Sequence, residues 1–162
     1  MWTCVDSPIG ELRLVERAGA LVAIDFHPFR PPVDGRPLGE RVEPAGHPVL
    51  AATAEQLAAY FARELTDFDL PLAPEGTPFQ QRVWAELRRI GYGETTSYGE
   101  VARRLGMTAA ASRAVGLANG RNPVPVVVPC HRVVGADGSL TGYAGGTDRK
   151  QLLLELEQPA LF

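Results

Sequence analysis

The residues with the clearest chemical potential are Cys130 and His131, which follow Pro129 directly in the sequence. A thiolate is a strong nucleophile, and an imidazole can take the thiol proton directly or through a water molecule. Adjacent side chains of an extended segment point in opposite directions, so we expect a bridging water and a residue that orients the histidine. The alternative interpretation is a buried cysteine that acts only as a small hydrophobic residue.

The segment that leads to Cys130 cannot be the interior of a helix. Three prolines interrupt residues 122–129, and each removes a backbone donor. Four valines lie in the same stretch and can pack it firmly. A rigid segment of this kind is an unusual place for an inert thiol, which favours the nucleophile.

Three helices are expected ahead of this segment. Thr77 to Gln80 forms a capping box with a proline at the first helical position, and the helix that it starts is predicted to end at Gly91. Ser97 to Glu100 is a second capping box, which opens a short helix that stops at Gly106. A third helix follows from about residue 108 to residue 118. Two short helices joined by a glycine-containing turn are typical of a helix-turn-helix, although many such pairs bind no DNA.

The first half of the chain predicts a small antiparallel sheet with a helix on one face. Residues 2–5, 10–17 and 20–26 alternate apolar and polar side chains, and turn-forming residues separate them. Residues 28–47 hold five prolines and three glycines and predict a long loop, for which mobility is one possibility. Apolar residues then recur at helical spacing over residues 48–64. A proline-containing linker at about 70–77 suggests a domain boundary after residue 76.

Composition limits the class of protein. The chain has 162 residues, of which 45% are hydrophobic and 22% charged, so a soluble globular protein is expected and a coiled coil is not. No secretory signal or membrane-spanning run is present, and the two cysteines favour free thiols in the cytoplasm. The net charge of −3 hides an asymmetry, because residues 77–150 hold ten basic and five acidic side chains. All but one of the 16 basic residues are arginine, which suits contacts to phosphates and bases.

Five motifs in this order resemble the O6-alkylguanine-DNA alkyltransferase family of the short bacterial Ogt type. They are Ser97-Tyr98-Gly99, Ser112-Arg113-Ala114-Val115-Gly116, Asn122-Pro123, Pro129-Cys130-His131-Arg132-Val133 and Gly142-Tyr143-Ala144-Gly145-Gly146. The resemblance covers about half of the chain and extends more loosely to the N-terminal half. It implies an α+β protein, with a ribonuclease-H-like domain over residues 1–76 and a DNA-binding, alkyl-accepting domain over residues 77–162.

The resemblance also implies the chemistry. Cys130 would take the alkyl group from O6 of guanine irreversibly, once per molecule, and restore the base. His131 would accept the thiol proton through a water, and Glu157 of the last helix would hold His131. Asn122 would hold the turn that joins the helix-turn-helix to the acceptor segment.

Further residues are implied in DNA and base recognition. Family members flip the damaged base through the minor groove, and Arg113 matches the arginine that fills the gap. Tyr98 would drive rotation of the nucleotide and face the flipped guanine. The remaining expected contacts with DNA or the base come from Ser112, Ala114, Arg121, Val133, Tyr143 and Ala144.

The expected partner is double-stranded DNA bearing O6-alkylguanine, with O4-alkylthymine left open. No cofactor, no metal and no membrane are expected. The free protein is expected to be a monomer, and cooperative assembly on DNA stays open. Two alternatives remain at this point: a protein that binds alkylated DNA without chemistry, which would usually lack the cysteine, and a dimeric helix-turn-helix regulator with a preferred operator.

Overall fold

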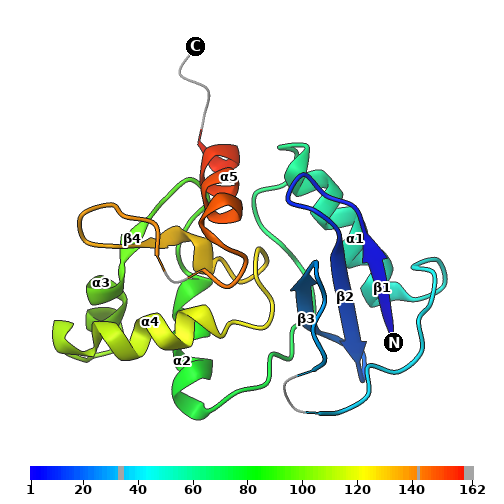
Figure 1. Ribbon diagram of the computed structural model, residues 1–162, viewed down its shortest axis with the longest axis horizontal. Coiled ribbons are helices and arrows are strands. Elements are labelled where there is room, and N and C mark those ends of the chain that lie inside the picture. Colours follow the sequence, from blue (N-terminus) through cyan, green and yellow to red (C-terminus); the bar gives the residue numbers. More distant parts are fainter. Residues whose placement is uncertain (33–34, 142, 159–162) are drawn as a thin grey trace. The chain divides into compact units, whose positions relative to one another are not determined.

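The computed structural model describes residues 1–32, 35–141 and 143–158 (Figure 1). Two compact units divide the chain, one from Met1 to Pro74 and the other from Glu75 onward. The expected α+β class is confirmed, since the first unit holds a sheet with a helix and the second is mainly helical. None of the helices among the described residues is both long and apolar enough to cross a membrane.

The first unit is a three-stranded antiparallel sheet covered by one helix (Figure 1). Its elements are β1 (Trp2–Val5), β2 (Leu12–Arg17), β3 (Ala20–Phe26) and α1 (Pro48–Phe61). The strand predicted from residue 10 begins at Leu12, because Gly10 has a φ of 100° and turns the chain. Ala18 and Gly19, both with positive φ, make the tight turn between β2 and β3.

The core of this unit lies between the sheet and α1. Fully or nearly fully buried are Leu12, Leu14, Leu21, Ile24, Leu50, Leu57 and Tyr60. The helix ends at Phe61, three residues before the predicted end, and the residue after its cap, Arg63, has a positive φ of 62°. The cap at Ala62 and this left-handed residue explain the earlier end, because an L side chain there cannot continue a right-handed helix.

The proline-rich stretch 28–47 is a loop that is partly fastened to the sheet. The Trp2 amide donates to the Glu40 carbonyl at 3.0 Å, and the Val42 amide donates to the Trp2 carbonyl at 2.9 Å. The Arg41 guanidinium also lies 5.1 Å from the centre of the Trp2 ring. Residues 33 and 34 of this loop lie outside the described part of the chain.

The second unit is mainly helical, and two of its helices contact the short turn that contains Cys130. Its elements are α2 (Pro78–Leu87), β4 (Thr96–Ser97), α3 (Tyr98–Arg104), the 3₁₀ helix η1 (Ala109–Ala111), α4 (Ser112–Gly120), the 3₁₀ helix η2 (Cys130–Arg132), β5 (Val133–Val134) and α5 (Thr147–Glu157). Helices α2, α3 and α4 contact one another, and α5 contacts η2 (Figure 1).

The predicted capping box of α2 is confirmed, but the predicted end of the helix is not. The Gln80 amide donates to the Thr77 hydroxyl at 3.1 Å, and the Gln80 side chain accepts from the Thr77 amide at 2.9 Å. The helix ends at Leu87 instead of Gly91. The last turn tightens, and the Ile90 carbonyl accepts a hydrogen bond from Arg132 at 2.6 Å, which fixes the chain in this non-helical path.

The helix pair α3 and α4 differs from prediction in two details. Ser97 caps α3 by accepting from the Glu100 amide at 3.1 Å, but among the described contacts the Glu100 carboxylate pairs with Arg103 and Arg104 and does not complete the box. The third helix, predicted over 108–118, starts as the 3₁₀ helix η1 and becomes α-helical only at Ser112, where the Ser112 hydroxyl donates to the Ala109 carbonyl. It continues to Gly120.

A two-residue parallel pair joins the start of α3 to the strand that follows Cys130, His131 and Arg132. Thr96 lies opposite Val133, and Ser97 lies opposite Val134. Nothing in the sequence predicted this pairing, because parallel partners are distant in the chain. It places the first residue of α3, Tyr98, next to the strand that leaves Cys130 and His131.

Candidate active site

Asn122 fixes the backbone of the loop before Cys130. Its side-chain amide donates to the Val128 carbonyl at 2.8 Å, and its side-chain oxygen accepts from the Val124 amide at 3.0 Å. Between these points Val126 has a positive φ of 73°, which is strained for a β-branched residue. Val126 is 1% exposed, so packing and the two Asn122 bonds hold a conformation that the free chain would avoid.

Cys130 begins the 3₁₀ turn η2 and is not on an extended strand. Its side chain is buried, with 4% of the residue exposed, and the thiol is free. The Cys130 amide donates to the Val128 carbonyl at 2.8 Å, and the Cys130 carbonyl accepts from the Asn119 side chain at 3.3 Å. The backbone around the sulfur is therefore held on both sides.

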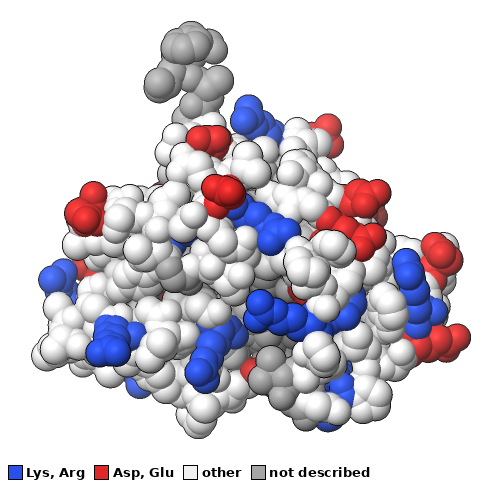
Figure 2. Space-filling view, viewed as in Figure 1, with Lys and Arg blue, Asp and Glu red and all other residues white. Residues whose placement is uncertain are grey.

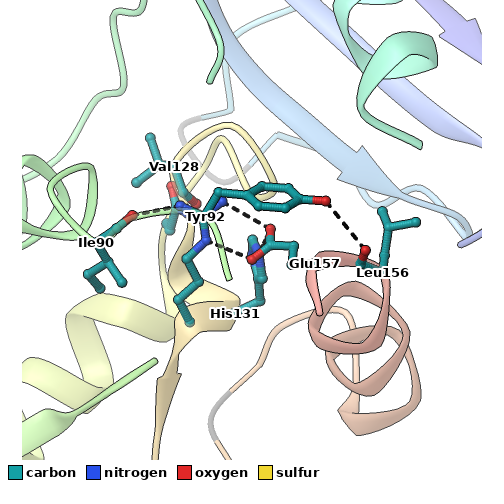
Figure 3. Close-up of polar contacts among 8 residues, drawn as sticks. Ile90, Tyr92, Val128, His131, Leu156 and Glu157 are labelled. Atoms are coloured by element: carbon teal, nitrogen blue, oxygen red, sulfur yellow. Dashed lines mark hydrogen bonds and ion pairs between the residues drawn. The ribbon is translucent and has the colours of Figure 1, made fainter. Parts of the chain in front are cut away.

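His131 and Glu157 form a buried pair next to the cysteine (Figure 3). The His131 Nε2 atom and the Glu157 Oε2 atom are 2.7 Å apart, and both side chains are almost completely buried. The other ring nitrogen, Nδ1, is also buried and has no hydrogen-bond partner among the described residues. An ionised Glu157 requires the proton on Nε2, which leaves a lone pair on Nδ1 that can accept a proton.

Arg132 forms an ion pair with the Glu157 carboxylate. It donates from Nε to Oε1 at 2.8 Å and from a terminal nitrogen to Oε2 at 3.0 Å, in a two-pronged ion pair. The centre of the Tyr92 ring is 5.8 Å from the Arg132 guanidinium carbon. The Tyr92 hydroxyl donates to the Leu156 carbonyl at 3.4 Å (Figure 3). The carboxylate thus has partners that satisfy its charge away from water.

Burial sets the resting protonation states. It raises the pKa of the Cys130 thiol to about 11, although the Asn122 side chain and the charge of Lys150 act in the opposite direction. Burial also lowers the pKa of His131, against the opposing effect of Glu157. At neutral pH the site therefore holds a thiol and a neutral imidazole, which is the protonation state that a general base requires.

On the other side of Cys130, Lys150 and Tyr98 meet at one backbone carbonyl. The Tyr98 hydroxyl donates to the Thr141 carbonyl at 2.8 Å, and the Lys150 ammonium donates to the same carbonyl at 2.7 Å. Lys150 also donates to the Val133 carbonyl at 2.6 Å. Burial raises the pKa of the Tyr98 hydroxyl, so it stays protonated and can donate.

The residues expected to contact DNA are placed as follows. Arg113, Ala114 and Arg121 are exposed and Ser112 is half-buried, all on or just after α4, while Ala144 is exposed in the loop before α5. Val133 is buried directly after η2, and Tyr143 is buried in the loop before α5, while Gly142 lies outside the described residues. On the face seen in Figure 2, basic side chains lie over the region that α3 and α4 occupy in Figure 1.

Sequence reasoning missed several residues of this site. Lys150, Asn119 and the pairing of Arg132 with Glu157 were not singled out, although all of these polar or charged side chains are buried. One signal was available for Lys150, because it is the single lysine among 16 basic residues. In the described residues no group of three or more histidine, cysteine or acidic side chains is arranged to hold a metal ion.

Comparison with known families covers almost the whole chain. Residues 78–159 match the DNA-binding domain of 6-O-methylguanine DNA methyltransferase, and residues 1–74 match the ribonuclease-like domain of the same family. A methylated-DNA–protein-cysteine methyltransferase of Mycolicibacterium paratuberculosis is 52% identical over 156 residues, which cover 95% of this chain and 90% of that protein. A relative of the same name from Methanosarcina barkeri is 46% identical over 159 residues, which cover 95% and 94%.

Solved structures agree with these matches. The crystal structure of Mycobacterium tuberculosis OGT in complex with DNA has a TM-score of 0.81 and 46% identity, and covers 98% of this chain and 95% of that one. A crystal structure of the O6-methylguanine methyltransferase from the same organism has a TM-score of 0.79 at the same identity, with coverages of 98% and 94%. Fold and sequence point to one family over both units.

Proposed function

The chain belongs to the 6-O-methylguanine DNA methyltransferase family, and we propose that the Sγ atom of Cys130 is its alkyl acceptor. The protein is a DNA-repair enzyme that binds DNA and transfers the methyl group of O6-methylguanine to a cysteine. The chain has two cysteines, and Cys4 lies on β1 of the N-terminal unit. The observation that carries the assignment is the position of Cys130 beside the buried His131–Glu157 pair.

The transfer is a single displacement. The thiol proton passes to Nδ1 of His131, directly or through a water, and the sulfur electron pair forms a bond to the alkyl carbon. The bond from that carbon to O6 breaks, and its electron pair stays with the purine. The purine takes up one proton, which makes normal guanine, so the proton lost by the thiol is balanced. A thioether does not return to a thiolate, and each molecule therefore acts once.

The need for a base follows from the pKa of the thiol. With a pKa of about 11, roughly one molecule in ten thousand carries a thiolate at pH 7. His131 would act as the proton acceptor, because its Nδ1 is unprotonated and its Nε2 is held by Glu157 at 2.7 Å. Asn122 acts as a positioning residue, since it holds the strained loop that delivers the sulfur.

Recognition of DNA is proposed for α4 and the loop before α5. The exposed side of α4 carries Arg113 between small residues, which suits close approach to the walls of a minor groove. Arg113 would fill the space left by the flipped base, Tyr98 would face the extruded guanine, and Arg121 would contact a phosphate. Ser112 and Ala114 would line the groove-facing side of the helix.

The flipped guanine would lie against the acceptor turn. The Val133 carbonyl and the Ala144 amide would read the edge of the base, and Tyr143 would form a wall of the pocket. We propose that the substrate is an O6-alkylguanine in duplex DNA.

The free protein is proposed to be a monomer, and the proposal does not specify whether molecules assemble cooperatively on DNA. Both cysteines are free thiols, which supports the expected reducing, cytoplasmic location.

Intact-protein mass spectrometry tests the acceptor. The protein is mixed with a duplex that contains one O6-methylguanine, and peptides are then mapped. We expect a gain of about 14 Da, the mass of one methylene, on Cys130, with saturation at one per molecule. Cys130→Ser should bind the duplex and gain nothing, whereas Cys4→Ser should react like the wild type. A gain on Cys4, or a second gain per molecule, would refute the assignment.

A further inference from the structure

Lys150 is a buried charge that the proposed reaction leaves without a role. It lies on α5 with no exposed surface, and it contacts two backbone carbonyls and the face of Tyr98, whose ring centre is 6.0 Å from Nζ. No carboxylate in the described part of the chain forms an ion pair with it. Burial of an ammonium carries a large desolvation penalty unless its partners compensate for it. An apolar residue would therefore stabilise the fold better at a position whose role was only structural.

The type of residue is also informative. Fifteen of the 16 basic residues are arginine, and the one lysine of the chain occupies this site. A guanidinium is a wide planar fork, whereas an ammonium is compact and directs three donors around one nitrogen. The two carbonyls, at 2.6 and 2.7 Å from Nζ, require such a compact donor.

We propose that Lys150 is a positioning residue for alkyl transfer, which holds the Val133 and Thr141 carbonyls and, through Thr141, the Tyr98 hydroxyl in place around the Cys130 sulfur. This role rests on the function proposed above. It deepens that function by adding a residue that neither sequence motif nor catalytic relay includes.

The connections form a closed ring of contacts. Val133 directly follows the turn that holds Cys130, and β5 pairs with β4, which ends at the cap of the helix that Tyr98 begins. The Tyr98 hydroxyl returns to Thr141, where it shares the carbonyl with Lys150. Loss of Lys150 would free the Val133 carbonyl and leave Tyr98 as the only described side-chain donor to Thr141.

The positive charge of Lys150 also affects the Cys130 thiol. The Lys150 ammonium opposes the effect of burial on the pKa of the Cys130 thiol. Burial lowers the pKa of Lys150 itself, and a thiolate at Cys130 acts against that shift. The groups that affect the sulfur are thus Lys150 and Asn122, with His131 beside it and Tyr98 facing it. The lysine favours negative charge on sulfur at the moment the thiol proton leaves.

The test is a double-mutant cycle on the full-length protein with an O6-methylguanine duplex. Lys150→Met should slow transfer at saturating DNA roughly ten- to a hundredfold, the usual effect of losing a group that orients a catalytic one. The affinity for undamaged duplex should stay within about twofold of wild type, because Lys150 is buried on α5 and does not lie on the exposed side of α4 that is proposed to bind DNA. Gln151→Met, an exposed neighbour on the same helix, is the matched control and should react at the wild-type rate.

The cycle with Tyr98→Phe separates positioning from general damage. Because Lys150 and Tyr98 share one carbonyl, the double variant should be only about threefold slower than the slower single variant. The proposal would be overturned if the rate loss of the double variant equalled the product of the losses of the two single variants. It would also be overturned if Lys150→Met transferred the methyl group at the wild-type rate. If Lys150→Met does not fold by its thermal unfolding curve, Lys150→Gln replaces it in the same cycle. Methylation of Cys130 in the wild type is measured alongside, so failure of the acceptor assignment would be seen separately.

Discussion

At the scale of single residues, the site separates two kinds of task. Cys130 is proposed to supply the electron pair, and burial raises the pKa of its thiol to about 11, so little thiolate is present at neutral pH. In the proposed relay His131 and Glu157 compensate for this, and Arg132 holds the Glu157 carboxylate through two hydrogen bonds. A buried thiol also reacts little with other electrophiles, which would suit a proposed acceptor that is used once.

Glu157→Gln tests the relay at this scale. The amide cannot fix the proton on Nε2 as the carboxylate does, so we expect transfer at pH 7 to fall about 10- to 100-fold. In this variant the rate should depend on direct ionisation of the thiol. Below a pKa of about 11 the thiolate fraction rises about tenfold per pH unit, so the variant should gain rate steeply between pH 7 and 9.5.

The transfer rate of the wild type should change less between pH 7 and 9.5, because burial lowers the pKa of His131 and the imidazole is already neutral at pH 7. Rates are measured by single-turnover transfer from duplex. Glu155→Gln, exposed on the same helix, serves as the control. Glu157→Gln also removes the charged partner of Arg132. Breaking a buried ion pair lowers the free energy of unfolding by about 3–5 kcal/mol, so unfolding curves are measured together with the rates. Parallel pH profiles for variant and wild type would contradict the relay.

At the scale of elements, short segments present the chemistry and longer ones support it. The proposed acceptor, Cys130, lies on a 3₁₀ turn of three residues, between a strained loop and a two-residue strand. Helix α5 supplies Lys150 and Glu157, seven residues apart and so two turns along one face. Helix α4 carries the exposed arginine proposed to fill the duplex, while its buried residue Asn119 holds the acceptor backbone.

Arg113→Ala tests the role of α4. Extrusion of a base costs a few kcal/mol, and the Arg113 side chain would offset part of that cost by filling the gap. Transfer from duplex should therefore fall about tenfold or more in the variant. Free O6-benzylguanine needs no extrusion and should react within about twofold of the wild-type rate. Both rates are measured with the same protein preparation. Arg89→Ala removes an exposed arginine at the end of α2 and should leave both rates unchanged. Equal losses on the two substrates would mean that Arg113 acts on the chemistry and not on the flipped base.

At the scale of the whole molecule, charge is divided between the two halves of the chain. Residues 1–76 hold six basic and twelve acidic side chains, whereas residues 77–150 hold ten and five. A net charge of −3 therefore conceals a basic half that matches a DNA-binding domain. Affinity for undamaged duplex should come from that half, through arginine contacts to phosphates.

The salt dependence of binding tests this division. Four exposed arginines lie on or beside the helix-turn-helix, namely Arg103, Arg104, Arg113 and Arg121. If two to four of them contact phosphates, the logarithm of the binding constant should fall with the logarithm of salt concentration with a slope of about −2 to −4. Arg121→Gln should reduce the slope by about one, as measured by fluorescence anisotropy with undamaged duplex. A slope near zero, or one that Arg121→Gln leaves unchanged, would exclude the proposed phosphate contact.

The amino-acid sequence alone determined the capping box of α2, the three strands of the first unit and the family. Local rules govern these features: Thr77 and Gln80 satisfy the free amides of a helix start, and alternating side chains define a strand. The family resemblance implied Cys130, His131 and Glu157, and the structure brings the last two within 2.7 Å although 26 positions separate them. Their roles remain predictions for the experiments above.

Only the tertiary structure decided which buried charges meet. The ion pair of Arg132 with Glu157, the shared Thr141 carbonyl and the parallel pairing of β4 with β5 all join residues distant in sequence. No local periodicity encodes such contacts, because they depend on how the helices pack. The end of α2 at Leu87 and the late start of α4 at Ser112 have the same origin, since side-chain bonds to the backbone override local propensity there.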